Sequence, residues 1–106
     1  MTEIVRAISI RQPLVEQILL GDKKFEYGSR ATMIQERVYL YASAKPFDDP
    51  NPWRRMKLRP TDLPSGVIVG NVETADCDWD DRSECYAYSL ARPERLRTHL
   101  RPVNQP

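Results

Sequence analysis

Polar and charged side chains that could hold a nucleotide gather in one short stretch of the chain. Lys23, Glu26, Ser29 and Arg30 lie close together in the sequence. Lysine and arginine can hold a phosphate group, and a carboxylate can accept a hydrogen bond from the amino group of a base. We therefore predict that this stretch binds a ligand that carries a phosphate, a base, or both.

Two further pairs of residues are expected to face the same ligand. Arg11 and Gln12 stand at the start of a predicted helix, whose unpaired N–H groups and dipole favour an anion. Ser43 and Lys45 follow a predicted strand and are expected to project toward the same mouth. Together with the first stretch, these residues form the predicted ligand-binding set.

The Lys23 and Glu26 pair allows a binding role or a catalytic role. If the two side chains meet, Glu26 keeps Lys23 protonated, and Lys23 then donates to a phosphate or to a base carbonyl. In a metal-independent ribonuclease or nucleoside hydrolase, one of the two, or a tyrosine, would instead be the general base. Because a basic lysine must be unprotonated, which a neighbouring carboxylate disfavours, binding is the preferred interpretation.

A second cluster interleaves an aromatic ring with cations. Trp53, Arg54 and Arg55 are followed closely by Lys57 and Arg59. Such a cluster can contact the phosphate backbone of RNA, and we predict that its first three residues form an RNA-binding rim. The alternative is a lid that Trp53 packs in place, with arginines that only face solvent.

Four tyrosines alternate along two predicted strands: Tyr39, Tyr41, Tyr86 and Tyr88. They could be stacking platforms for bases or ordinary packing residues.

The composition predicts a single globular domain over residues 1–106, since the chain is 41% apolar and long enough for one core. The net charge of +1 excludes strong nucleic-acid binding by the field of the whole protein, so any such binding depends on a local patch. No apolar run is long enough to span a membrane, and no signal peptide is visible at the N-terminus. These features predict a cytoplasmic protein without a membrane partner.

No metal site or other cofactor is expected. His99 is the only histidine, and Cys77 and Cys85 are too few for a disulfide framework. Although these cysteines could face each other across a hairpin, we expect them to stay reduced.

One helix is predicted between Pro13, which suits a first helical position, and Gly21, which suits a C-terminal cap. The apolar residues between them recur at helical spacing: Leu14, Val15, Ile18 and Leu19.

Five segments have the alternation or apolar content of strands: 7–10, 24–27, 36–43, 66–74 and 85–90. We expect Trp53 to lie in a helical turn over the barrel mouth, 76–84 to be an acidic hairpin loop, and 92–96 to begin a short helix. The pattern predicts an α+β fold, a small and partly open β-barrel of about five to six strands.

Six blocks follow one another along nearly the whole chain: SIRQP (9–13), GDKKFE (21–26), VYLYASAK (38–45), GVIVG (66–70), YAYSL (86–90) and RPVNQP (101–106). In this order they resemble the ASCH domain family of the PUA-like superfamily of small barrels. The resemblance implies a cleft in which the Ser-x-Arg-Gln-Pro turn faces the Gly-x-Lys-x-x-Glu motif. It also implies binding of single-stranded RNA or a nucleotide, although some members are hydrolases and others could be protein-binding accessory domains of transcription or translation complexes.

Three departures from the family pattern bear on function. Gly28 stands where the family usually has an arginine, and the nearest arginine is Arg30. Glu26 stands where amidohydrolase relatives have a nucleophilic threonine, so that specific chemistry is rejected. Related chains usually continue past the block that ends at Pro106 into one more strand, whose absence would leave an exposed sheet edge.

Overall fold

A mixed five-stranded sheet forms most of the protein, in the order β1-β3-β4-β5-β2. The computed structural model describes residues 4, 6–28 and 35–102. The strands are β1 (Ala7–Ile10), β2 (Phe25–Gly28), β3 (Glu36–Ala42), β4 (Val67–Asp80) and β5 (Cys85–Leu100). The helices are α1 (Leu14–Leu19), α2 (Pro50–Met56) and a short 3₁₀ turn (Pro60–Asp62). The α+β class is therefore confirmed.

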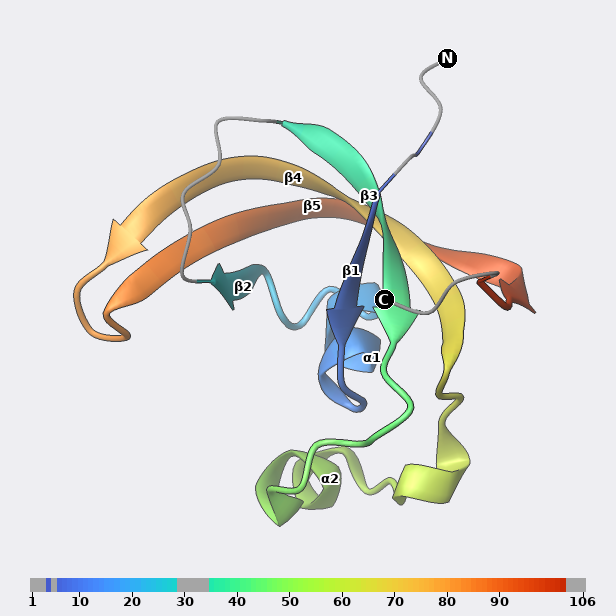
Figure 1. Ribbon diagram of the computed structural model, residues 1–106. Helices are drawn as coiled ribbons and strands as arrows, with labels where there is room; N and C mark the ends of the chain where they lie inside the picture. The colour runs from blue at the N-terminus through green and yellow to red at the C-terminus, as the bar shows by residue number, and fades with distance from the viewer. Residues whose placement is uncertain (1–3, 5, 29–34, 103–106) are drawn as a thin grey trace.

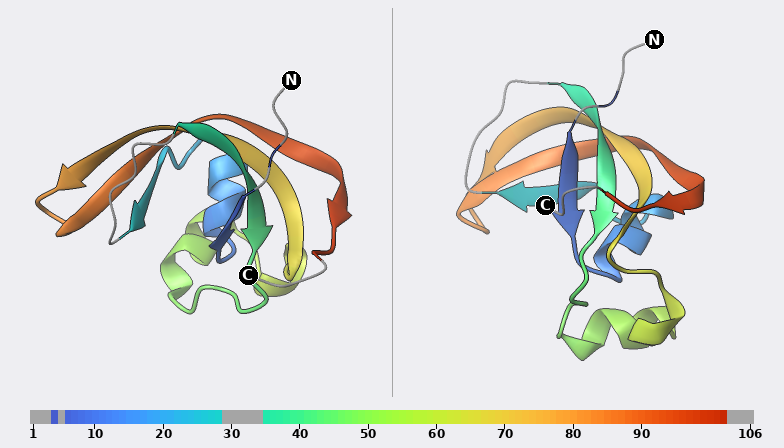
Figure 2. Two further views of the ribbon diagram at one scale, coloured as in Figure 1. Left: turned by 45° about the horizontal axis from the view of Figure 1, so that its top comes forward. Right: turned by 45° about the vertical axis from the view of Figure 1, so that its right-hand side comes forward.

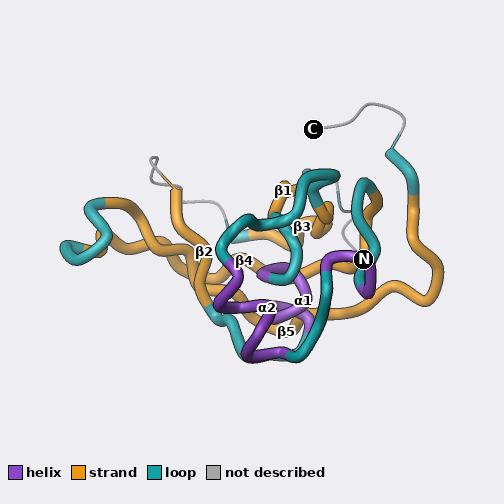
Figure 3. The backbone as a smooth tube through the Cα atoms, turned by 90° about the horizontal axis from the view of Figure 1, so that it is seen from below, coloured by secondary structure: helices purple, strands orange, loops and turns teal. Residues whose placement is uncertain are grey.

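The long strands β4 and β5 arch over the rest of the molecule (Figure 1). α1 lies under this arch, while α2 lies beyond the ends of β1 and β3 (Figures 1 and 2). Viewed from below, the tip of the β4–β5 hairpin reaches away from both helices (Figure 3).

The sheet does not close into the barrel that the sequence predicted. Among the described residues, β1 pairs only with β3, in parallel, and β2 pairs only with β5, antiparallel. Closure would need these two edge strands to pair with each other. Since each has only four residues and is paired on one side, the described part of the chain forms an open, curved sheet.

The core lies between α1 and the concave face of the sheet. Val15 and Ile18 of α1 are buried, as the helical spacing predicts, and Gly21 ends the helix at a φ of +84°. The alternation in β3 is also confirmed, because Val38, Leu40 and Ala42 are buried. These side chains join apolar residues of the other strands in one cluster: Ile10, Val69, Val72 and Leu90.

Two segments that were expected to be a helix start and a loop belong to strands instead. The segment 92–96, where a short helix was expected, belongs to β5, and the first half of the expected acidic loop 76–84 belongs to β4. Pairing with β4 overrides the local helix preference: Asn71 lies opposite Glu94 and Gly70 lies opposite Arg95. Arg95 also donates two hydrogen bonds of 2.9 Å to the Glu16 carboxylate on α1.

No helix within the described ranges is long and apolar enough to cross a membrane.

Gly70 allows β5 and α1 to approach β4 closely. A Cβ atom at this position would collide with the backbone oxygen of Glu94 and with the side chain of Leu19. We expect Gly70→Ala to lower the free energy of unfolding by about 1–3 kcal/mol, because neither neighbour can move without disturbing the sheet or the helix. Urea unfolding measures this change.

The matched control is Thr98→Ala, at an exposed position of β5. It should change the free energy of unfolding by less than about 0.5 kcal/mol. Equal stability of the Gly70→Ala variant and the native protein would contradict the close packing described above.

Candidate functional site

A cavity of about 450 Å³ lies where the sheet fails to close. Residues of both edge strands line it, together with residues of β3, β4 and β5. Its polar lining comes from side chains of several elements: Arg6, Ser9, Glu26, Glu36, Thr74 and Tyr88. Ile8, Ile10, Val38 and Leu90 make the remaining walls apolar. This size and this mixture of walls are typical of small-molecule sites.

The carboxylate of Glu26 is incompletely satisfied. Its Oε1 accepts a hydrogen bond of 3.0 Å from the Tyr27 N–H. Its Oε2 is fully buried and accepts no hydrogen bond from any residue that the structure describes. Lys23 Nζ lies 3.9 Å from Oε2, close enough for an ion pair but too far for a hydrogen bond. The described residues therefore leave the hydrogen-bonding capacity of Oε2 unused.

The turn after α1 brings Lys23 to Glu26. The backbone N–H groups of Asp22 and Lys23 both donate to the Gln17 carbonyl oxygen, at 2.9 and 3.1 Å. These two hydrogen bonds to one acceptor curl the chain back toward α1. The Lys23 ammonium also lies 5.3 Å from the centre of the Tyr27 ring. The two residues that the sequence singled out thus meet, as a binding role requires.

Lys23 also lines a smaller hollow of about 260 Å³. Lys24 and Arg92 contribute further cationic side chains to this hollow, and Leu90 lines both it and the larger cavity. The Lys23–Glu26 ion pair therefore lies between the cationic hollow, which Lys23 lines, and the larger cavity, which Glu26 lines.

Tyr88 lies beside Glu26 because the two residues pair across β2 and β5. Burial raises the pKa of the Tyr88 phenol above its ordinary value of 10.0, and the neighbouring Cys77, Cys85 and Tyr86 raise it further. Tyr88 is therefore a neutral phenol at physiological pH.

Gly28, where the ASCH pattern that the sequence resembles has an arginine, leaves room for the Tyr88 ring. A Cβ atom at position 28 would lie 2.8 Å from the ring carbon Cε2 and 2.9 Å from the hydroxyl oxygen. Any larger residue, including the arginine usual in the family, would displace this ring from its place. The absence of a side chain at position 28 and the place of the Tyr88 ring in the cavity wall are thus physically linked.

The predicted turn contributes Ser9 to the cavity rather than Arg11 or Gln12. Arg11 is exposed and does not line the cavity. Gln12 is only 2% exposed, so its predicted role as a ligand contact does not fit its place. Its side chain accepts from the Glu16 N–H and donates to the Pro64 carbonyl oxygen, which ties the start of α1 to a distant loop.

The other predicted binding residues divide between two places. Ser43 forms a 2.7 Å hydrogen bond with Ser9, at the wall of the cavity. Lys45 and Arg54 line a separate shallow groove beside α2, with a volume of about 870 Å³. Ser29 and Arg30 lie outside the described residues.

The predicted RNA-binding rim is only partly correct. α2 confirms the expected helical turn, but Trp53 is 7% exposed and its indole N–H donates to the Phe47 carbonyl oxygen at 2.9 Å. Trp53 is therefore a packing residue and cannot stack on a base. Arg54 lines the groove, whereas Arg55 is exposed elsewhere on α2.

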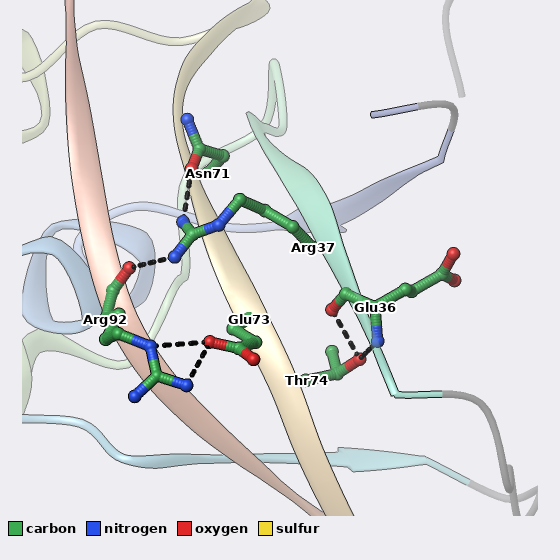
Figure 4. Close-up of polar contacts among 6 residues, drawn as sticks. All are labelled: Glu36, Arg37, Asn71, Glu73, Thr74 and Arg92. Atoms are coloured by element: carbon green, nitrogen blue, oxygen red, sulfur yellow. Dashed lines mark hydrogen bonds and ion pairs between the residues drawn. The ribbon is translucent and has the colours of Figure 1, made fainter. Parts of the chain in front are cut away.

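Charged side chains of β3, β4 and β5 outside the cavity already satisfy one another (Figure 4). Arg37 donates to the Asn71 side chain and to the Arg92 carbonyl oxygen. The Arg92 guanidinium in turn donates a hydrogen bond of 2.7 Å to the Glu73 carboxylate on β4. This bond holds β5 to β4 at Arg92, whose backbone has a φ of +49°. These charges hold the strands together and leave Lys23 and Lys24 as the cations of the hollow without a strong hydrogen-bonded partner in the described residues.

Sequence reasoning did not identify Thr74 and Glu36 as parts of the cavity wall. Thr74 Oγ1 donates to the Glu36 carbonyl oxygen at 2.9 Å, across a strand pairing that only the register reveals. A polar residue at the end of an apolar run was the one signal that could have drawn attention to Thr74.

The described residues contain no group of His, Cys, Asp and Glu side chains that could hold a metal ion. Cys77 lies opposite Tyr88 and Cys85 lies opposite Asp80, so the two cysteines do not face each other across the hairpin.

Comparison with known proteins yields no relative: no protein-family model matches this chain, and no curated protein matches it significantly.

Because Tyr88 is partly buried, the free energy of unfolding is expected to fall as the pH rises above the ordinary pKa of tyrosine. Because its pKa is raised in the folded state, the folded protein keeps this proton to a higher pH than the unfolded chain does. The resulting stabilisation is complete below the ordinary pKa of 10.0 and is lost as pH rises through the folded-state value. We expect the stability difference between the native protein and Tyr88→Phe to shrink above about pH 10.

Urea unfolding from about pH 7 to about pH 12 tests this expectation. The difference between the two proteins should stay constant up to about pH 9 and then fall. A difference that is constant across the whole range would show that Tyr88 titrates alike in both states.

Proposed function

We propose that this chain is an ASCH-type domain that binds a nucleotide unit of RNA, with the base in the cavity and a phosphate at the adjacent hollow. The observation that carries the proposal is Glu26, a residue of the cavity wall whose buried Oε2 accepts no hydrogen bond from the described part of the chain. A buried carboxylate oxygen in this state costs about 1–3 kcal/mol or more, which a donor from a ligand would offset.

The base that fits this oxygen carries an exocyclic amino group. Cytosine and adenine present such a donor, whereas uracil presents a carbonyl oxygen at the position where cytosine has its amino group. A carbonyl oxygen placed against the Glu26 carboxylate would be repelled. We therefore expect cytosine to bind more tightly than uracil.

The phosphate fits the cationic hollow. Lys23 lies at the boundary of the two spaces, so it can stay near Glu26 and donate to a phosphate at the same time. Lys24 lines the same hollow and adds a second positive charge. The two spaces adjoin at Leu90, which lines both, and the proposal places the phosphate in one and the attached base in the other.

The cavity favours binding over the hydrolase alternative. A tyrosine that acts as a general base needs a lowered pKa, but burial raises the pKa of Tyr88. Lys23 lies 3.9 Å from a Glu26 carboxylate oxygen, so it faces a carboxylate and not a group from which a general base takes a proton. The neutral Tyr88 phenol is therefore not a base at physiological pH.

Binding of cytidine 5′-monophosphate and uridine 5′-monophosphate, measured by titration calorimetry, tests the proposal. We expect Glu26→Gln to weaken cytidine monophosphate binding at least about tenfold, because a hydrogen bond to a charged group is lost. Lys23→Ala should weaken both nucleotides by a similar factor, because both carry the phosphate.

The matched control is Glu94→Gln, which removes a carboxylate from an exposed position of β5. It should leave both affinities within about twofold. If Glu26→Gln binds cytidine monophosphate as tightly as the native protein does, the assignment of the base to this cavity is wrong.

A further inference from the structure

The shallow groove beside α2 has the charge and the position of a second nucleic-acid subsite. We propose that it binds the phosphate backbone of a single RNA strand whose base occupies the cavity, so that the ligand is an oligonucleotide rather than a free nucleotide. This inference rests on the proposed function for the identity of the first subsite. It adds a separate site with its own residues and its own test.

The groove carries an excess of positive charge. Its charged lining consists of four cations and two carboxylates: Lys45, Arg54, Lys57, Arg59, Asp48 and Asp62. Arg59 forms an ion pair with Asp62 at 3.8 Å. Lys45, Arg54 and Lys57 form no ion pair with any residue in the described ranges. Three cations along one groove can therefore bind successive phosphates.

The walls of the groove are held in place by hydrogen bonds. The Trp53 indole donates to the Phe47 carbonyl oxygen, and the Phe47 N–H donates to the Gln12 carbonyl oxygen at 2.8 Å. The Gln12 side chain donates to the carbonyl oxygen of Pro64, which follows the groove residues Pro60 and Asp62 in the chain. At the end of α2, the Lys57 N–H donates to the Arg54 carbonyl oxygen, which fixes the spacing of these two cations. The groove is thus preformed, which lowers the entropic cost of binding.

The groove and the cavity are connected along one side of the molecule. Ser9 lines the cavity and is hydrogen-bonded to Ser43, at 2.7 Å. Lys45, which lines the groove, follows Ser43 by two residues, a backbone path of at most about 7 Å. Figure 1 shows both β1 and β3 ending on the side of the molecule where α2 lies. One strand of RNA can therefore run from the cavity past Ser43 into the groove.

Arg55 provides a control within the same helix. It is an exposed cation next to Arg54, but it does not line the groove. A general attraction between RNA and basic residues would involve Arg54 and Arg55 equally. A defined groove requires Arg54 alone.

The test compares cytidine monophosphate with an oligocytidine of about eight nucleotides, a length within the range that small single-strand-binding domains cover. Binding to the full chain is measured by calorimetry for the monomer and by fluorescence anisotropy for the oligomer, at about 50 mM and about 200 mM salt. We expect the oligomer to bind at least about tenfold more tightly than the monomer at the lower salt.

The triple variant Lys45→Ala, Arg54→Ala, Lys57→Ala should abolish this gain and leave the affinity for cytidine monophosphate within about twofold. Three lost phosphate contacts should also reduce the slope of log affinity against log salt by about 2. Arg54→Ala alone should produce part of both effects, while Arg55→Ala should produce neither. All of these side chains are exposed, and circular dichroism verifies that each variant is folded.

Oligomer binding no tighter than monomer binding would overturn the inference, as would equal effects of Arg54→Ala and Arg55→Ala. A glutamate-rich peptide that binds the groove as tightly as the oligomer would also overturn it, because the partner would then be an acidic protein. A loss of oligomer affinity in the triple variant, together with no effect of Glu26→Gln, would support the groove and refute the cavity assignment.

Discussion

The candidate site depends on the failure of two short edge strands to pair with each other. β1 is held by β3 and β2 by β5, and the sheet curves enough to bring these edges to the two sides of one cavity. A closed barrel would fill this space with backbone hydrogen bonds. In the open sheet, Ser9 on one edge and Glu26 on the other both line it. The gap therefore creates the cavity, and the edge strands supply part of its polar chemistry.

The distribution of paired and unpaired charges distinguishes structural from functional residues. Arg95 is held by Glu16, and Arg92 by Glu73, so these pairs join α1, β4 and β5 into one frame. The Glu16 carboxylate also raises the pKa of the Arg95 guanidinium, through the hydrogen bonds between them. Glu26, by contrast, keeps one buried oxygen without a donor in the described chain. The proposed binding role rests on this difference between Glu26 and the paired charges.

Local sequence patterns correctly predicted elements that depend mainly on their own residues. They failed where pairing between distant segments determines the secondary structure. The spacing in α1 and the alternation around Leu40 correctly identified the core, and Gly21 was correctly identified as a helix cap. The segment 92–96 is a strand because β4 supplies its hydrogen bonds, which no local pattern reveals. Similarly, sequence indicated Lys23 and Glu26, but the curl that joins them depends on the Gln17 carbonyl oxygen. The burial of Trp53 depends on Phe47, so its role could not be predicted from its aromatic ring and basic neighbours.

The central claim is that Glu26 Oε2 recognises the amino group of a base inside the cavity. The most direct measurement is a crystal structure of the protein with cytidine 5′-monophosphate. The account predicts that the N4 amino group lies about 2.7–3.2 Å from Glu26 Oε2 and that the phosphate lies beside Lys23. A nucleotide bound with its amino group directed away from Glu26, or bound outside the cavity, would contradict the claim.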